Sequence, residues 1–376
     1  MTPQYSHPTR LRDYIAFMLP WAHGHQLNGI TDFVSARVEK QTACQAQLAR
    51  CFDNQEAATK RLSRLLHNER LNPKTLADAV LLQALHQLPS RGPIRLAIDW
   101  TVEDSQHLLV VSLIMGRRGV PIDWRAYDAS VLKGRMKRYE ASVICRAITR
   151  VTQRVGKRRV IVTADRGFAD VALFKLLSEL GVRFIIRVKA GTNVAFEGRW
   201  CRLSQIPFRG NERHRSLGAL YYCESDPPRL WISKCRARDA KGKRGIWHLV
   251  SNHPYEAKSA AQEYGRRFGC EEGFRDAKWW LGFTKARITQ IKAGSRMFVL
   301  FAIAVLVMNT LGSELLLTKG PQAMRLLRRV ASRRQGRCEL GLVSAMISLL
   351  QQDHSLYEAL SPHVTLRLEA TLANVS

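Results

Sequence analysis

The chain has 376 residues, of which 46% are apolar and 24% charged, as in ordinary folded proteins with a buried core. Its charge is unusual, because 59 Lys and Arg residues against 31 Asp and Glu residues give a net charge of +28. Such an excess means self-repulsion unless a polyanion is the partner, and nucleic acid is the first candidate; a merely soluble basic protein is less expected, because the basic residues recur in clusters along the chain.

Three further features of the sequence predict the cellular compartment of the protein. The eight cysteines are scattered, with no C-x-x-C pair and no zinc-like spacing, which predicts reduced thiols in the cytoplasm. The segment MTPQYSHPTRLRDY at the start lacks the apolar stretch of a signal peptide. The most apolar run, MFVLFAIAVLVM at 297–308, is shorter than the ~20 residues of a bilayer span, so we predict a buried core helix and no membrane partner.

Residues 1–90 are predicted to form a helical DNA-binding domain. Asp53 and Glu56 have the spacing of a capping box for a helix over 55–69, and the apolar pattern of 74–88 predicts a second helix. Lys60, Arg64 and His67 share one face of the first helix. A basic face fits DNA binding, but it also fits an ordinary solvated helix.

After this helical part the pattern changes to strands. The first three predicted strands form an antiparallel arrangement, and a helix–strand–helix–strand series follows, which is the order of a ribonuclease-H-like α/β fold over 91–190. The predicted strands are RLAIDWT (95–101), HLLVVSLIMG (107–116), VPIDWRAY (120–127), RVIVTAD (159–165) and VRFIIRVK (182–189), with helices over 138–154 and 169–180.

The rest of the chain divides into three parts. Short strand-like pieces separated by turn residues predict a β-rich insertion over 191–250, after which the core resumes over 251–315. A helix is expected to begin there with Asn252 or His253 as N-cap and Pro254 in its first turn. The last part, 316–376, is predicted to be helical and contains a basic block of Arg325, Arg328, Arg329, Arg333, Arg334 and Arg337.

The stretch EYGRRFGCEEGFRDAKWWLG (263–282) contains four polar residues at helical spacing. Tyr264, Arg267, Glu271 and Lys278 follow one another at steps of three, four and seven, so a continuous helix would present them on one face. The pattern indicates a helix face directed at a polar ligand; the alternative is a solvated face with incidental ion pairs.

Two strand-end carboxylates complete a candidate site. Asp99 and Asp165 each end a predicted strand, these strands are neighbours in the proposed fold, and Glu271 would supply a third carboxylate. Hard oxygen donors without His or Cys suit Mg²⁺ or Mn²⁺. Each Asp alone would more often be a turn residue, and other carboxylates lie close in sequence: Glu103, Asp104, Asp123, Asp170, Glu272 and Asp276.

LAIDWT, TADRGF and the Tyr-Arg-Glu-Lys stretch together resemble the bacterial insertion-sequence transposases of the DDE type, in the branch with the Y-(2)-R-(3)-E-(6)-K signature. The resemblance covers roughly 95–312. It implies that Asp99, Asp165 and Glu271 bind the metal, and that Tyr264, Arg267 and Lys278 hold phosphates of the transposon end.

The resemblance also implies a role for one tryptophan of the insertion. In members that release the element through DNA hairpins, a Trp on the last inserted strand stacks a flipped base, and Trp247 fits that place. An ordinary strand aromatic in a β-core is the alternative, and Trp231 is the rival for the stacking role. Trp279 and Trp280 are predicted to pack the helix.

The resulting hypothesis is a homodimeric, Mg²⁺-dependent DNA transposase, cytoplasmic and nucleoid-associated, that binds terminal inverted repeats of double-stranded DNA. It would cut the 3′ ends and join them to target DNA, with hairpin ends as one route. The alternatives are a ribonuclease-H-fold endonuclease or resolvase without strand transfer, and a catalytically silent DNA-binding relic.

Overall fold

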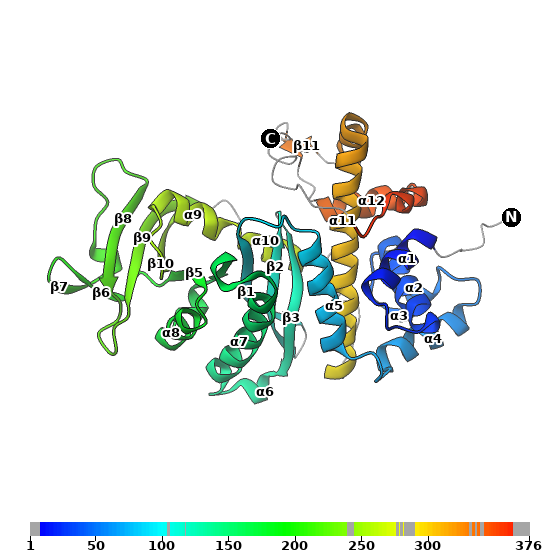
Figure 1. Cartoon of the computed structure of the whole chain (residues 1–376), viewed down its shortest axis with the longest axis horizontal. Coiled ribbons are helices and arrows are strands. Elements are labelled where there is room, and N and C mark those ends of the chain that lie inside the picture. Colours follow the sequence, from blue (N-terminus) through cyan, green and yellow to red (C-terminus); the bar gives the residue numbers. More distant parts are fainter. Residues whose placement is uncertain are drawn as a thin grey trace.

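The computed structural model describes residues 8–103, 106–116, 118–238, 244–275, 278, 281, 290–330, 333–334, 337–338 and 342–363. A mixed sheet lies at the centre, helices cover both of its faces, and a long helix separates it from a group of N-terminal helices (Figure 1). The predicted α/β class is therefore confirmed.

The eight-stranded sheet has the order β3-β2-β1-β4-β5-β10-β9-β8. The first three strands are antiparallel, β1, β4 and β5 are parallel, and β10, β9 and β8 continue antiparallel from β5. All five strands predicted before residue 190 are present. The strands of this sheet are β1 (Ile94–Glu103), β2 (Gln106–Met115), β3 (Arg118–Asp128), β4 (Val160–Ala164), β5 (Arg183–Val188), β8 (His214–Tyr221), β9 (Arg229–Arg238) and β10 (Arg244–Ser251).

The middle of the sheet is buried because helices cover both of its faces. Every residue of β4 is buried, which is the usual pattern for a central parallel strand. Helix α7 (Met136–Val155) packs against β2, β3 and β4, and α10 (Phe268–Arg275) packs against β1, β2 and β3. Trp100 contacts α7 whereas its neighbour Asp99 contacts Arg267, just before α10, so the two helices lie on opposite faces.

The segment predicted as an insertion contributes β8, β9 and most of β10 to the main sheet. The short hairpin of β6 (Asn193–Phe196) and β7 (Arg199–Arg202) pairs separately, while β10 is hydrogen-bonded to β5. Helices α8 (Val171–Glu179) and α9 (Ala257–Gly265) pack on this half of the sheet, α8 against β5 and α9 against β5, β8, β9 and β10. These strands are therefore linked by continuous backbone pairing, through β5, to β4, the strand that Asp165 follows.

Helix α11 (Ile291–Val330) joins the N-terminal helices to the sheet. It contacts α2, α4 and α5 as well as β3, and Figure 1 shows it standing between these two parts. Arg296 on α11 donates hydrogen bonds to the carbonyls of Leu66 and Leu71 at 3.0 and 3.1 Å. The N-terminal helices are α1 (Thr9–Met18), α2 (Gly24–Lys40), α3 (Gln45–Ala49), α4 (Gln55–His67) and α5 (Pro73–His86).

The prediction of a core helix at 297–308 is confirmed, but the length argument behind it is wrong. The apolar part of α11 runs over Ile291–Leu315 and is long enough to cross a bilayer, and its most apolar 18-residue window has a mean hydropathy of 1.9. However, 94% of its most apolar window is buried inside the protein. Burial by α2, α4, α5 and β3, rather than insufficient length, makes it a core helix.

Two predicted N-caps are wrong. Helix α4 is capped by Asn54 instead of Asp53, because Asn54 directly precedes the helix and its side chain accepts from the Ala57 N–H at 2.9 Å. Helix α9 begins at Ala257, after Glu256, instead of near Pro254. The Asn252 amide is used elsewhere: it bonds the Val182 carbonyl and the Phe184 N–H at 2.9 and 3.0 Å, which extends the edge of β5.

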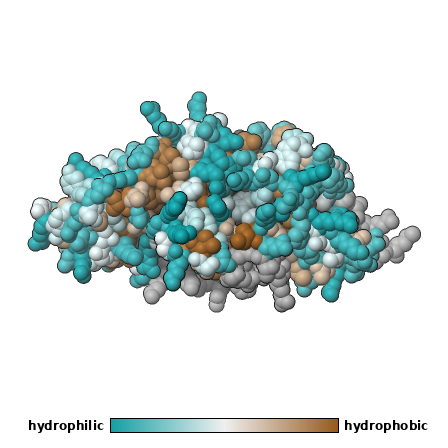
Figure 2. Space-filling model, turned by 90° about the horizontal axis from the view of Figure 1, so that it is seen from below, coloured by the Kyte–Doolittle hydropathy of each residue, from teal (hydrophilic) through white to brown (hydrophobic). Residues whose placement is uncertain are grey.

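The C-terminal part contains α12 (Leu342–Leu350), which packs against α11, and a short 3-10 helix, His354–Ala359, which contacts α1. The pair β11 (Arg333–Arg334) and β12 (Arg337–Cys338) precedes them. The side chains of the predicted basic block lie outside the described residues. Elsewhere hydrophilic side chains dominate the face seen in Figure 2, with small apolar patches among them.

Candidate active site

Asp99 and Asp165 lie at the same place on adjacent parallel strands. The pairing of β1 with β4 ends at Ile98 and Ala164, so each aspartate is the residue directly after the last pair. β4 ends at Ala164, so Asp165 directly follows the strand instead of being its last residue, as the prediction had it. Asp99 does not end its strand: β1 continues to Glu103 because β2 pairs with it along its whole length.

The carboxylate of Asp165 is oriented by the turn that follows it. Asp165 caps the 3-10 turn Arg166–Phe168, and its Oδ1 accepts a hydrogen bond from the Gly167 N–H at 2.8 Å. A Cβ added at Gly167 would lie 3.0 Å from the same oxygen. The sequence TADRGF therefore combines a capping carboxylate with the small residue that its close contact requires.

Glu271 is brought to the sheet by an unusually close helix–strand contact. A Cβ added at Gly273 on α10 would lie 2.7 Å from the Gly119 carbonyl oxygen, and one added at Gly119 on β3 would lie 2.9 Å from the Cα of Cys270. Glycines at both positions let the backbones of α10 and β3 touch. The sequence did not predict the role of either glycine, because Gly119 and Gly273 are far apart in the chain and come together only when α10 packs on β3.

The four signature residues do not share one continuous helix, so that prediction is wrong. Helix α9 ends at Gly265, and the N–H groups of Arg266 and Arg267 bond the carbonyls three residues earlier, at 3.2 and 3.0 Å. This tightening breaks the α-helical ladder before α10 begins at Phe268. Tyr264 therefore lies in the last turn of one helix, Glu271 lies in the next, and Arg267 lies in the turn between them.

Arg267 is the centre of the site. Its guanidinium, 5% exposed, donates from Nη1 to Oδ2 of Asp99 at 3.1 Å and from Nη2 to Oε1 of Glu271. It also lies over the rings of Tyr264 and Phe268, 5.7 and 5.5 Å from their centroids. One buried cation therefore joins two of the three predicted acidic residues and two aromatic rings.

The pKa values show that the acidic residues interact. Burial, reinforced by the charges of Asp165 and Glu271, raises the pKa of Asp99 to about 6 although Arg267 lowers it. Burial lowers the pKa of Arg267, but Tyr264, Asp99 and Glu271 outweigh burial and raise it overall. The structure thus brings Asp99, Asp165 and Glu271 within electrostatic reach of one another around a single arginine.

The donor chemistry of this site fits a hard divalent cation, because all three acidic side chains offer only oxygen. In this arrangement Arg267 offsets part of the negative charge of the three carboxylates. Among the residues that the structure describes, no three His, Cys, Asp or Glu side chains gather closely enough to hold one ion. A divalent cation held by Asp99 and Glu271 would have to replace the guanidinium between them.

The other predicted contact residues lie in two different environments. Lys278, after α10, donates from Nζ to the Val102 carbonyl of β1 at 2.9 Å. Tyr264 and Trp247 are buried, 1% and 5% exposed, and their rings meet edge to face at 5.1 Å with Phe268 alongside. Trp231 is 39% exposed, and Trp279 and Trp280 lie outside the described residues.

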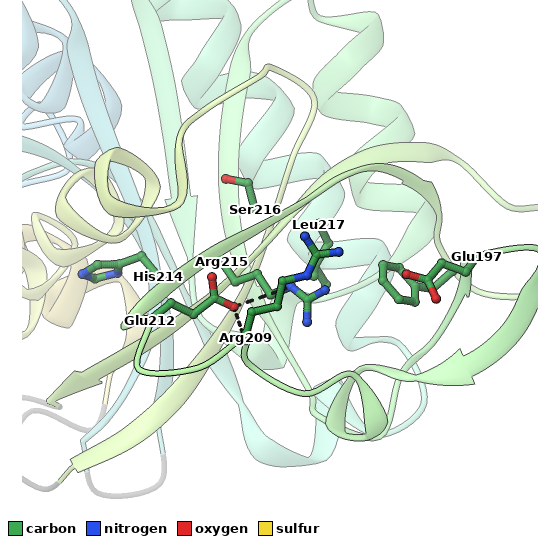
Figure 3. Close-up of a pocket in the computed structure, with 8 residues that line it drawn as sticks. Glu197, Arg209, Glu212, His214, Arg215, Ser216 and Leu217 are labelled. Atoms are coloured by element: carbon green, nitrogen blue, oxygen red, sulfur yellow. Dashed lines mark hydrogen bonds and ion pairs between the residues drawn. The ribbon is translucent and has the colours of Figure 1, made fainter.

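A cavity of about 220 Å³ lies in the insertion and contains none of the predicted site residues (Figure 3). Arg209 and Arg215 point into it, and Glu212 accepts from the Arg209 N–H at 2.5 Å and lies 3.6 Å from Arg215 Nε. Glu212 and Arg215 therefore form an ion pair, whereas Arg209 contacts Glu212 through its backbone N–H.

Part of the chain is similar to a known protein family. Residues 132–307, slightly less than half of the chain, match the family model described as the transposase DDE domain. This span contains Asp165, Glu271 and the whole Tyr-Arg-Glu-Lys stretch, whereas Asp99 precedes it. No curated protein matches the chain. The family match supports a transposase of the DDE type, with DNA as the partner that this family implies.

Proposed function

We propose that this protein is a DNA transposase that binds terminal inverted repeats, cleaves the 3′ ends and transfers them to target DNA. The observation that carries the proposal is the convergence of Asp99, Asp165 and Glu271 around Arg267, inside a chain that matches the transposase DDE domain. Asp99 and Glu271 come from segments 172 positions apart, and the fold brings them to one buried guanidinium.

A ribonuclease-H-like core is part of this proposal. Its support is the strand order β3-β2-β1-β4-β5, with three antiparallel strands followed by two parallel ones. We further propose the division into a helical DNA-binding part (1–90), core (91–190 and 251–315), β-rich insertion (191–250) and C-terminal helical part (316–376).

Asp99, Asp165 and Glu271 are the proposed ligands of Mg²⁺, and we expect Mn²⁺ to substitute for it in assays. When bound, such ions activate the attacking oxygen and stabilise the departing one in phosphodiester chemistry. The chain's own contribution is to hold the three carboxylates close together and to offset part of their negative charge with Arg267 in the DNA-free protein.

DNA is proposed to reach this edge along the basic surface of the protein, whose net charge is +28. Tyr264, Arg267 and Lys278 are the proposed phosphate contacts; Arg267 would then exchange a carboxylate for a phosphate. A homodimer that holds both transposon ends, cut-and-paste chemistry with hairpin ends, and a cytoplasmic, nucleoid-associated location complete the proposal.

The test uses a labelled duplex containing the DNA that flanks the protein's own reading frame, together with a target plasmid. With Mg²⁺ we expect 3′ nicks and joined products, and none in EDTA. Asp99→Asn, Asp165→Asn and Glu271→Gln should each abolish cleavage while DNA binding persists. Glu272→Gln and Asp170→Asn are the matched controls, because Glu272 pairs with Arg118 and Arg275, and Asp170 caps α8.

Each alternative gives a different result in the same assay. Cleavage without joined products would indicate an endonuclease or resolvase, and repeat-specific binding without cleavage would indicate a DNA-binding relic. If all three single variants cleaved DNA at the wild-type rate, the assignment of Asp99, Asp165 and Glu271 as catalytic residues would be overturned.

A further inference from the structure

Beyond the acidic residues, a buried glutamate on α7 is connected to both aspartates. Glu140 is 4% exposed, and each of its carboxylate oxygens accepts one hydrogen bond. Oε1 accepts from the indole Nε1 of Trp100, and Oε2 accepts from Nζ of Lys137, both at 2.9 Å. With a donor on each oxygen, this carboxylate has a fixed orientation.

Each of the two donors to Glu140 is connected to one of the predicted catalytic aspartates. On one side, the backbone N–H of Trp100 donates to Oδ1 of Asp99 at 2.9 Å. On the other side, Lys137 Nζ also donates to the Gly167 carbonyl at 2.9 Å, and the Gly167 N–H donates to Oδ1 of Asp165 at 2.8 Å. The two aspartates are therefore joined through Trp100, Glu140, Lys137 and Gly167.

The sheet itself cannot supply this connection. Pairing between β1 and β4 stops at Ile98 and Ala164, one residue before each aspartate. Beyond that point β1 continues along β2, while the chain after β4 turns away into Arg166–Phe168. The contacts from α7 bridge these two diverging segments, on the face of the sheet opposite α10.

We propose that Glu140 and Lys137 are positioning residues that set the relative orientation of the Asp99 and Asp165 carboxylates. Their role rests on the proposed function, in which those two carboxylates act together. The two residues touch neither aspartate themselves and act through the N–H groups of Trp100 and Gly167. No cofactor or DNA contact is assigned to either of them.

The chain provides a matched control for a buried carboxylate beside the same helix. Asp123 on β3 is also 4% exposed, and it accepts hydrogen bonds from Arg146 and Arg150 of α7. Arg150 also donates to Asp78 of α5, so this set of bonds connects β3 and α7 to α5 instead of to Asp99 and Asp165. Removing the Asp123 charge should destabilise the fold without a specific effect on catalysis. Lys133→Met provides the control for an exposed lysine before α7.

The experiment measures kcat and KM for cleavage of the flanking-DNA duplex, together with backbone amide resonances. Glu140→Gln and Lys137→Met should lower kcat about 10- to 100-fold, the range found for residues that orient metal ligands, and leave KM for DNA unchanged. Lys137→Arg should restore part of the rate, because a guanidinium can donate to both Glu140 and Gly167. The amide resonances of Trp100 and Gly167 should shift in Glu140→Gln and Lys137→Met.

Asp123→Asn should lower the melting temperature and leave kcat and those two resonances near wild-type values at a temperature where it is folded. The proposal is overturned if Lys137→Met retains both wild-type kcat and wild-type resonances, or if Asp123→Asn loses kcat as strongly as Glu140→Gln. If the wild type cleaves no DNA, the proposed function fails, and the two amide resonances alone decide whether Glu140 and Lys137 orient the aspartates.

Discussion

Arg267 donates a hydrogen bond to Asp99 across 3.1 Å and holds Glu271 with its other terminal nitrogen. The guanidinium is thus the buried counter-charge of two carboxylates that would otherwise repel each other. This relationship makes Arg267 a structural residue of the DNA-free protein as well as a proposed phosphate contact.

Arg267→Ala should therefore destabilise the protein. Removing one partner of a buried ion pair leaves an uncompensated charge and costs ~3–5 kcal/mol; we expect about 3 because Glu271 remains about a third exposed. Denaturant unfolding measures the change. Arg266→Ala is the control, since Arg266 is 38% exposed and 3.9 Å from Glu263. Equal stability of the two variants would contradict the central role of Arg267.

Gly273→Ala should impair cleavage more than it impairs DNA binding. The new methyl group would lie 2.7 Å from the Gly119 carbonyl, so α10 must move away from β3 and carry Glu271 with it. Displacement of a catalytic group by about 1 Å can cost ~10²-fold in rate. Gly265→Ala, whose Cβ meets no atom within 4 Å, should retain activity. Comparable cleavage rates in both variants would show that the Gly119–Gly273 contact does not position Glu271.

Acid should destabilise the fold through His248. Burial, with help from Lys234 and Arg187, lowers its pKa from 6.5 to about 4. Between these values the unfolded chain binds a proton that the folded protein does not, so the free energy of unfolding falls as pH drops from 6.5 towards 4, by on the order of 2 kcal/mol. His248→Gln should flatten this part of the stability profile, measured by unfolding at several pH values.

The exposed His67 provides the comparison, because His67→Gln should leave the slope unchanged. A wild-type profile that is already flat between pH 6.5 and 4, or one unaffected by His248→Gln, would contradict the prediction.

Trp247→Ala should cost stability, because the ring packs against Tyr264 and Phe268 instead of facing solvent. Large-to-small changes at buried aromatics cost ~3–5 kcal/mol. Trp231→Ala should cost much less, since that ring is 39% exposed. Thermal unfolding of both variants checks this, and similar melting temperatures would contradict the observed burial.

The base-stacking role of Trp247 stays a prediction with its own assay. Stacking requires the ring to leave its contacts with Tyr264 and Phe268. The base–aromatic contact would contribute ~1–3 kcal/mol of binding free energy per base. Folded Trp247→Ala should still nick the 3′ end but form hairpins slowly, with partial rescue by a substrate that lacks the base. A normal hairpin yield, or no hairpins from the wild type, would leave Trp247 as a core residue only.

DNA binding should weaken steeply with salt. Displacement of counterions at ~6–10 phosphates lowers affinity on the order of 10³-fold or more between 50 and 200 mM salt. Fluorescence anisotropy with a labelled duplex measures the slope. A flat response would mean that the +28 excess serves a purpose other than phosphate contact.

The sequence was informative where one local pattern determined the structure. Apolar runs located β1 to β5, and the strand order placed Asp99 beside Asp165. The prediction that the four signature residues share one helix was wrong, because residue spacing assumes an unbroken helix and the helix is interrupted at Arg267. The buried location of Trp247 and the Glu140 connection depend on contacts between segments distant in sequence, which periodicity does not encode.

The packing of α11 between the N-terminal helices and the sheet has a consequence for where DNA would be cut. Arg296 and the buried face of α11 hold both sides of this contact, so the N-terminal helices cannot swing on a loose tether. If those helices bind the DNA end as proposed, the fold fixes the distance between the bound DNA segment and Asp99. The number of base pairs between recognition and incision would then be a property of the fold.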